Sequence, residues 1–197
     1  GSEMCIRDRL EVDGWGVDLC LAGVQKAWAL PPGLSLVSVS RRALRHSEKA
    51  TAKGFYFDWV EHESRIADLQ TPSTPPLSLL FQLRRALDLM DEEGLPARYR
   101  RHRDLRERVL QWAQGRFEPY AQAGFRSPSL TALRGGGVDL GELLERARRR
   151  GFVVGSGYGK TRGEVFRVGH MGAIDEPLLE ECLQVLDEEL ERMGTGR

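Results

Sequence analysis

The segment of residues 17–33 constrains the fold most, because it joins an apolar run, a lone lysine and a Pro-Pro-Gly turn. Residues 17–22 are nearly all apolar over a short length, which is typical of a strand buried on both faces. A loop over residues 23–33 follows and carries Lys26. Residues 34–40 alternate between apolar and polar side chains, so we expect them to form the next strand.

Lys26 is the candidate for chemistry in this segment. The chain has only four lysines among its 29 lysines and arginines, and this one has apolar neighbours, which are Val24, Ala27, Trp28 and Leu30. Arginine stays protonated in proteins, whereas a desolvated lysine can lose its proton near neutral pH and act as an amine nucleophile. The alternative is a lysine whose stem packs while its ammonium group reaches water.

Composition indicates a globular chain without a strongly charged partner. A length of 197 residues and a hydrophobic content of 41% suit one large or two small domains. The formal net charge is zero and no apolar run reaches transmembrane length, so neither a nucleic-acid nor a membrane partner is expected. The three cysteines and four histidines are scattered without metal-ligand spacing. They predict a reducing, cytoplasmic location and no bound metal.

Residues 1–9 match neither a helical nor a strand pattern, and residues 4–9 look like a translated sequencing adaptor joined to a gene fragment. We therefore expect a non-native tail, with the native sequence starting near Leu10. The alternative is an ordinary flexible N-terminal tail.

The middle of the chain predicts two consecutive helices after an irregular stretch. Residues 54–58 are aromatic and expected to be extended, and residues 62–69 are expected to be a polar loop. Prolines break regular structure over residues 71–76. Leucines at three- and four-residue spacing then predict a helix that ends near Gly94, and Pro96 opens a second helix.

The second helix combines an apolar face with an arginine-rich face. Leu105, Val109 and Trp112 are expected to be buried. The other face carries arginines interleaved with acidic residues, and these are Arg98, Arg100, Arg101, Arg103, Arg106 and Arg108. Such a face could bind nucleic acid, but no aromatic stacking platform accompanies it. We interpret it as a solvated face with ion pairs between neighbouring turns.

The last third alternates predicted strands with helices and indicates an α+β domain from about residue 95. Asp139 and Asp175 occupy helix N-cap positions. The glycine-rich residues 155–163 resemble a phosphate-binding loop, but Val154 stands where that motif requires glycine, and a strand follows instead of a helix. We therefore interpret them as a hairpin turn.

Arg167 lies within residues 165–168, which otherwise form an apolar strand. An arginine in such a strand needs an anionic partner, because an unpaired buried charge is very costly. The partner is either an internal carboxylate or the carboxylate of a substrate.

Four segments occur in the order found in one enzyme family. Residues 24–33, with Lys26 and the Pro-Pro-Gly turn, are similar to its cofactor-lysine segment. Residues 71–76 resemble the stretch before its linking helix, residues 127–132 a small-domain strand, and residues 165–169 the strand with its carboxylate-binding arginine. The family is that of the class V (fold-type I) pyridoxal-phosphate aminotransferases, most of all the alanine–glyoxylate, serine–glyoxylate and serine–pyruvate group. The resemblance covers nearly all of this chain but only the C-terminal part of the family's.

This resemblance implies an α/β fold in which the end of a large PLP-transferase domain precedes a small C-terminal α+β domain. The C-terminal part of the large domain, with the start of the linking helix, would occupy residues 10–94. The small domain would occupy residues 95–197. The active enzyme would be a homodimer with its active sites at the interface.

The resemblance also implies the cofactor and the site residues. The cofactor would be pyridoxal 5'-phosphate, with Lys26 as its catalytic Schiff-base lysine and Gln25 beside it. Thr74 would bind the phosphate of the partner subunit's cofactor, and Arg167 would bind the substrate's α-carboxylate. The implied reaction is transamination between a small amino acid, alanine or serine, and a 2-oxo acid such as glyoxylate or pyruvate.

Three family features lie upstream of the lysine and have no counterpart here: the aspartate at the pyridine nitrogen, the ring-stacking residue and the phosphate loop. The resemblance therefore implies a truncated enzyme that is inactive alone. Two alternatives on the same fold are a phosphoserine aminotransferase and a lyase such as cysteine desulfurase. The lyase usually has histidine where this chain has Gln25, and it needs a mobile cysteine, whereas Cys20 and Cys182 are expected in a strand and on a helix's apolar stripe. A non-enzymatic binding module, built on the basic helix or the glycine-rich segment, is the third alternative.

Overall fold

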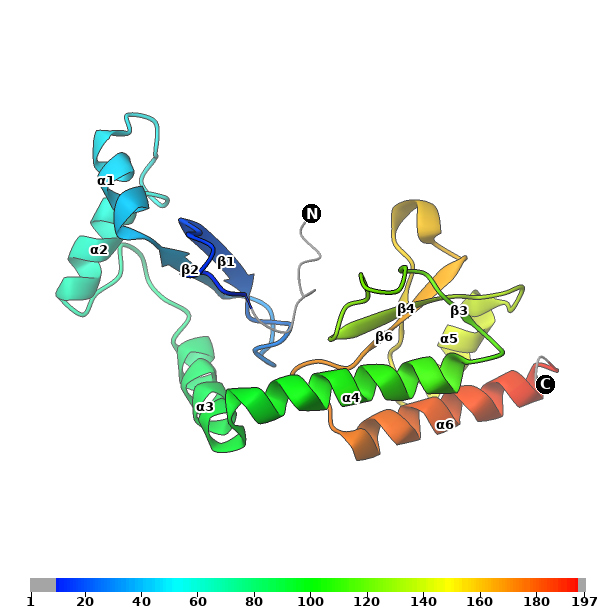
Figure 1. The fold of residues 1–197 in the computed structure, drawn as a ribbon. Helices are drawn as coiled ribbons and strands as arrows, with labels where there is room; N and C mark the ends of the chain where they lie inside the picture. Colours follow the sequence, from blue (N-terminus) through cyan, green and yellow to red (C-terminus); the bar gives the residue numbers. More distant parts are fainter. Residues whose placement is uncertain (1–9, 195–197) are drawn as a thin grey trace. The chain divides into compact units, whose positions relative to one another are not determined.

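The computed structural model describes residues 10–194, which form two compact units (Figure 1). The first unit is Leu10–Leu89, and the second comprises residues 90–194. The division between them falls inside a helix, a few residues before Gly94. The tail expected over residues 1–9 lies outside the described residues.

The first unit opens with a two-stranded antiparallel sheet of β1 (Leu19–Gly23) and β2 (Ser35–Val39). β2 confirms the strand expected from the alternating pattern. The prediction that the first strand is buried on both faces is wrong, because the side chains of Leu19 and Leu21 are 50% and 71% exposed. Within the described residues β1 pairs only with β2, and nothing covers the face that carries both leucines.

Two short helices, α1 (Arg41–Lys49) and α2 (Trp59–Ala67), follow this hairpin. The polar loop predicted over residues 62–69 is wrong for most of its length, because α2 occupies it. The carboxylate of Asp58 accepts hydrogen bonds from backbone N–H groups in the first turn of α2 and so starts the helix. Residues 54–57 form turns rather than the expected extended segment.

The next two helices are α3 (Leu77–Glu93) and α4 (Leu95–Ala113), which confirm the two predicted from leucine spacing and from proline. They are separated by Gly94, whose φ of 77° lies in the left-handed region that glycine adopts without strain. The irregular stretch over residues 71–76 precedes α3 as expected.

The second unit is built on a four-stranded antiparallel sheet in the order β3-β4-β6-β5. Its strands are β3 (Glu118–Pro119), β4 (Leu130–Arg134), β5 (Gly155–Ser156) and β6 (Val165–Gly169). The glycine-rich segment joins the neighbouring antiparallel strands β5 and β6 and contains a short 3₁₀ turn, Gly159–Thr161. This arrangement confirms the hairpin interpretation.

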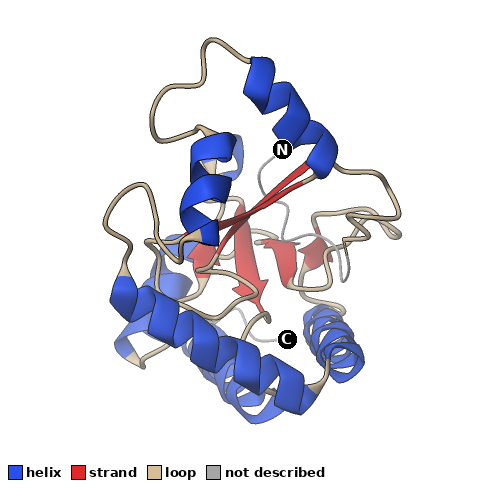
Figure 2. Ribbon diagram, turned by 90° about the vertical axis from the view of Figure 1, so that its left-hand side faces the viewer, coloured by secondary structure: helices blue, strands red, loops and turns tan. Residues whose placement is uncertain are grey.

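Helices α4, α5 (Leu140–Arg149) and α6 (Glu176–Arg192) pack with this sheet, and α4 and α6 lie side by side (Figures 1 and 2). Asp139 and Asp175 accept hydrogen bonds from the third residue of α5 and of α6, each at 3.0 Å, which confirms both predicted caps. The core lies between helices and sheet. It includes Leu105, Val109, Trp112, Leu133, Leu143, Phe166, Val168, Leu179, Leu183 and Leu186.

The solvated-face interpretation of α4 is wrong for Arg98, whose residue surface is only 8% exposed. Its Nη1 lies 2.9 Å from a carboxylate oxygen of Glu93. Arg101 donates to the same carboxylate at 2.7 Å, to the Gly172 carbonyl at 3.0 Å and to the Ile174 carbonyl. The loop that follows β6 therefore lies against this part of α4 and covers it.

Candidate functional site

Lys26 lies on a turn that backbone hydrogen bonds close tightly. Val24 N donates to Leu34 O at 3.2 Å, and Leu30 N donates to Val24 O at 3.1 Å. Ala29 N donates to Lys26 O at 2.9 Å. Val24 and Leu30 are buried, whereas Lys26 is exposed. The two apolar neighbours thus anchor the turn, and the amine projects from it.

The turn ends at Gly33, which has a φ of 132°. A Cβ at this position would lie 2.9 Å from Cδ1 of Leu79, in the first turn of α3. The chain after the lysine therefore packs closely against the start of α3.

Replacing Gly33 with alanine should lower the free energy of unfolding by about 2 kcal/mol, because an L residue is strained at this φ. Gly14→Ala is the matched control: its φ is not in the left-handed region, and the nearest atom to its Cβ would be 3.7 Å away. The control should change stability by less than about 0.5 kcal/mol. Urea denaturation measures both values, and equal losses would show that the backbone at Gly33 is unstrained.

Gln25 and Thr74 are both exposed in the same unit as Lys26. The Gln25 side chain folds back over Gly23, where an added Cβ would lie 2.6 Å from its Oε1. Thr74 lies in the irregular stretch before α3, and its hydroxyl makes no hydrogen bond to any residue within 10–194. The neighbouring Thr71 hydroxyl instead donates to Ser73 O at 2.7 Å and so stabilises the stretch.

Arg167 is the central residue of β6 in the second unit. Its Nε donates to the backbone carbonyl of Ser156 on β5 at 2.9 Å. The sequence left open an internal carboxylate as its partner, but no carboxylate of the described chain lies within ion-pair distance of it. Its two Nη atoms, which a planar guanidinium presents side by side, are therefore available to an anion.

Sequence reasoning missed two buried histidines near the end of β6. His170 is fully buried, and its Nε2 lies 2.9 Å from the Thr131 hydroxyl oxygen. His102 lies on the buried face of α4. Burial lowers the pKa of each imidazole to about 4, so both are uncharged at neutral pH. The position of His102 relative to Leu105 is a helical core spacing, which is the signal that could have identified it.

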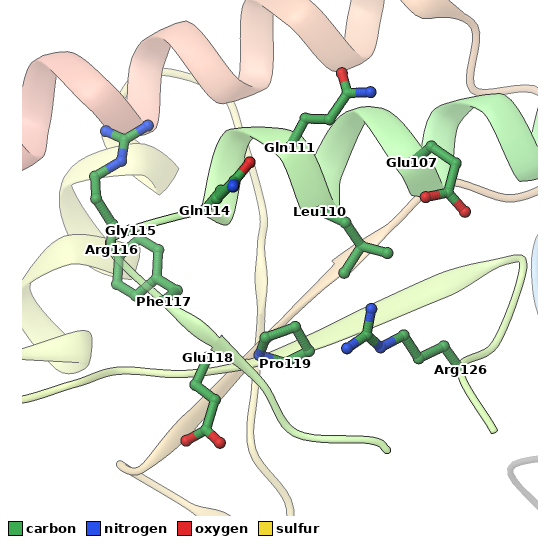
Figure 3. A pocket seen from close by; sticks show the side chains of 10 residues that line it. All are labelled: Glu107, Leu110, Gln111, Gln114, Gly115, Arg116, Phe117, Glu118, Pro119 and Arg126. Carbon is green, nitrogen blue, oxygen red and sulfur yellow. The ribbon is translucent and has the colours of Figure 1, made fainter. Parts of the chain in front are cut away.

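A shallow hollow of about 630 Å³ lies beside the end of α4 and β3 (Figure 3). It is lined by Glu107, Leu110, Gln111, Gln114, Gly115, Arg116, Phe117, Glu118, Pro119 and Arg126. None of the predicted site residues lines it. Its lining combines charged and amide side chains with the apolar groups of Leu110, Phe117 and Pro119.

The structure thus places three predicted site residues, Lys26, Gln25 and Thr74, in the first unit and Arg167 in the second. Within residues 10–194 no three or more His, Cys, Asp or Glu side chains form a metal-binding group. Across the same range, every helix is too short or too polar to span a bilayer.

Comparison with known proteins gives consistent matches in sequence and fold. No protein-family model matches the chain. The chain is 36% identical over 98% of its length to the serine–glyoxylate aminotransferase of Arabidopsis thaliana, of which it covers 49%. It is 32% identical to a Synechococcus sp. (strain PCC 6716) protein named soluble hydrogenase, small subunit, over 93% of this chain and 48% of that protein.

A solved structure shares the fold of both units. The alanine–glyoxylate aminotransferase from Nostoc sp. matches with a TM-score of 0.85 and 28% identity, over 92% of this chain and 50% of that one. The chain spans about half the length of the curated relatives it matches. With these matches and the order of its four family-like segments, the chain belongs to the class V (fold-type I) pyridoxal-phosphate aminotransferases and corresponds to their C-terminal half.

Proposed function

We propose that this chain is the C-terminal half of a pyridoxal-phosphate-dependent aminotransferase. The proposed reaction moves an amino group between alanine or serine and a 2-oxo acid such as glyoxylate or pyruvate. The observation that carries the proposal is the Lys26 turn, which projects a single amine between two buried anchors. The names of the relatives, a serine–glyoxylate and an alanine–glyoxylate aminotransferase, support the substrate class.

The described residues fit the cofactor by their chemistry. Lys26 is an exposed amine that can bond to an aldehyde, and Thr74 has an exposed hydroxyl that can donate to a phosphate oxygen. In this proposal Thr74 serves the cofactor of the partner subunit, and Gln25 lies beside the ring. When bound, the cofactor withdraws electrons from the substrate's Cα and makes its proton removable.

The protein's part of the chemistry falls to Lys26 and Arg167. With the cofactor bound, the amine of Lys26 would accept the proton from the substrate's Cα and hold it for return to the product. Arg167 holds the α-carboxylate with its two Nη atoms and so fixes the orientation of the Cα–H bond. A dimer with the active site at its interface is part of the proposal, as is a cytoplasmic location, which suits the free thiols of Cys20 and Cys182.

The exposed apolar face of the β1–β2 hairpin supports a larger functional protein. Leu19 and Leu21 are both at least half exposed on that face, where a complete large domain would cover them. The residues proposed to hold the pyridine nitrogen and most of the phosphate would then belong to the rest of that domain. By this account the chain is a fragment that is inactive alone.

The transaminase proposal is favoured over a cysteine desulfurase by the state of Cys182. Burial raises the pKa of its thiol to about 11, so it stays protonated at neutral pH and is a poor nucleophile. Cys20 lies within β1, a paired strand, and lacks the mobility that the desulfurase reaction requires.

Lys26→Ala should abolish covalent binding of the cofactor in the complete polypeptide that contains this chain. The wild-type protein with added pyridoxal phosphate should show the absorbance band of the bound cofactor. Borohydride reduction followed by peptide mass spectrometry should place the added mass on Lys26. Lys49→Ala is the control, because Lys49 is exposed at the end of α1 and should leave the band unchanged. A wild-type protein without the band, or with the mass on another lysine, would end the proposal.

A further inference from the structure

Three residues form a row across one face of the second unit's sheet. Ala132 of β4 and Gly155 of β5 are the direct register partners of Arg167 on either side of β6. Directly paired residues of antiparallel strands project from the same face. The neighbours of Arg167 along β6, Phe166 and Val168, point into the core, so this row lies on the face away from it.

The edge strand β5 contacts Arg167 at two points. The carbonyl of Ser156 accepts the Nε hydrogen bond at 2.9 Å. A Cβ built on Gly155 would lie 3.6 Å from both Cβ and Nε of Arg167 and 3.4 Å from its carbonyl oxygen. The arginine side chain therefore lies across Gly155, where it meets only backbone. One edge of the guanidinium is held by Ser156, and the two Nη atoms are left for an anion.

We propose that Gly155 is a positioning residue for binding of the substrate's α-carboxylate. Its lack of a side chain lets Arg167 lie across β5, with Nε on the Ser156 carbonyl and the Nη pair directed to the carboxylate. The inference rests on the proposed function of Arg167. The φ of Gly155 is outside the left-handed region, so a substitution acts through its contact with Arg167 and not through backbone strain.

The contact distances predict a graded response to side-chain size at this position. The single methyl group of alanine would sit at ordinary van der Waals distance from the Arg167 side chain. The γ-methyl groups of valine would occupy the space through which that side chain passes. Alanine should therefore be tolerated, whereas valine should turn the guanidinium away from its hydrogen bond with Ser156.

The test uses the complete cofactor-loaded polypeptide. Gly155→Val should raise KM for the amino donor about tenfold or more with a much smaller change in kcat, because ground-state carboxylate binding is lost. The dissociation constant of an unreactive α-hydroxy acid should rise in parallel. Gly155→Ala should raise KM much less than Gly155→Val does, because its methyl group stays at ordinary van der Waals distance from Arg167. The cofactor's absorbance band should be unchanged in both variants.

A double-mutant cycle ties the effect to Arg167. Arg167→Ala should itself raise KM, and adding Gly155→Val to it should raise KM no further. The inference would be overturned if the increases in KM of the two single variants combined fully in the double variant. A folded Gly155→Val with the KM of the wild type would overturn it as well. If the valine variant fails to fold, Gly155→Ser replaces it, and a KM no higher than that of Gly155→Ala has the same meaning. An unchanged KM in Arg167→Ala would instead remove Arg167 from the proposed site.

Discussion

Lowering the pH from neutral to about 4.5 should destabilise the second unit steeply, because it buries two uncharged histidines. Burial lowers the pKa of His102 and of His170 from 6.5 to about 4. In the unfolded chain both imidazoles take up a proton near pH 6.5. The unfolded state therefore binds more protons between pH 6.5 and about 4, and the folded state loses stability as the pH falls through that window. The full loss is on the order of 3 kcal/mol for each histidine.

The charges around the two imidazoles oppose their protonation further. The positive charges of Arg101 and Arg98 lower the pKa of His102, and the negative charge of Glu93 has a smaller, opposite effect. The charge of a protonated His102 in turn lowers the pKa of His170. The two rings therefore titrate as a pair, and protonating one makes the second proton harder to add. Replacing either histidine should make the remaining one easier to protonate.

Urea denaturation at several pH values between 7 and 4.5 measures this effect. His102→Gln and His170→Gln should each reduce the slope of stability against pH by up to about 1.4 kcal/mol per pH unit. Glutamine at position 170 keeps a polar group for the hydrogen bond to Thr131. An unaltered slope in the variant that lacks both buried histidines would show that other groups cause acid unfolding.

Arg101→Gln should cost about 3 kcal/mol of unfolding free energy, because its guanidinium joins α4 to the loop after β6. The substitution removes the largest cause of the lowered pKa of Glu93, the hydrogen bond from Arg101. It also removes the hydrogen bonds that the carbonyl oxygens of Gly172 and Ile174 accept from Arg101. The pKa of Glu93 should rise toward its ordinary value, so that less of the remaining stability is lost when this carboxyl is protonated in acid.

A second arginine on α4 provides the matched control. Arg108 donates to Glu180 at 2.7 Å, but their side chains are 37% and 39% exposed, against 24% and 25% for Arg101 and Glu93. Arg108→Gln should therefore cost less than about 1 kcal/mol. Arg101→Lys should recover only part of the lost unfolding free energy, because an ammonium group cannot reproduce the planar set of N–H donors of the guanidinium. Equal losses in Arg101→Gln and Arg108→Gln would show that the loop is held by other contacts.

The helical half of the fold was predictable because its signals are local. Leucine spacing identified α3, and the aspartates before α5 and α6 satisfy backbone N–H groups that every helix leaves unpaired. The same signal occurs before α2, where Asp58 precedes Glu61 at capping-box spacing. The aromatic residues around it suggested extended structure and outweighed the cap.

Burial was harder to predict, because it depends on which elements meet. The apolar composition of β1 suggested two covered faces, yet the described chain covers neither Leu19 nor Leu21. Arg98 and His102 continue the helical spacing of the core residues of α4, but polar residues at such positions are not expected to be buried. Only the loop after β6, which is distant in sequence, explains why they are buried.

The candidate site shows the same division between local and long-range information. Lys26 was identified by its apolar neighbours and its turn, and Arg167 by its place in an apolar strand. Gln25 and Thr74 have no local signal and rest on the family resemblance alone. Gly155 was not identified, because the register that sets it beside Arg167 is a product of strand pairing and is not encoded in local spacing.

The β1–β2 hairpin has a consequence for handling the polypeptide in solution. Within the described residues each of its two strands has one unpaired edge, and Leu19 and Leu21 make one of its faces apolar. Open edges beside an apolar face act as a template on which further strands can add. We therefore expect separate copies to associate through this hairpin, and an added charge on its apolar face should keep them apart.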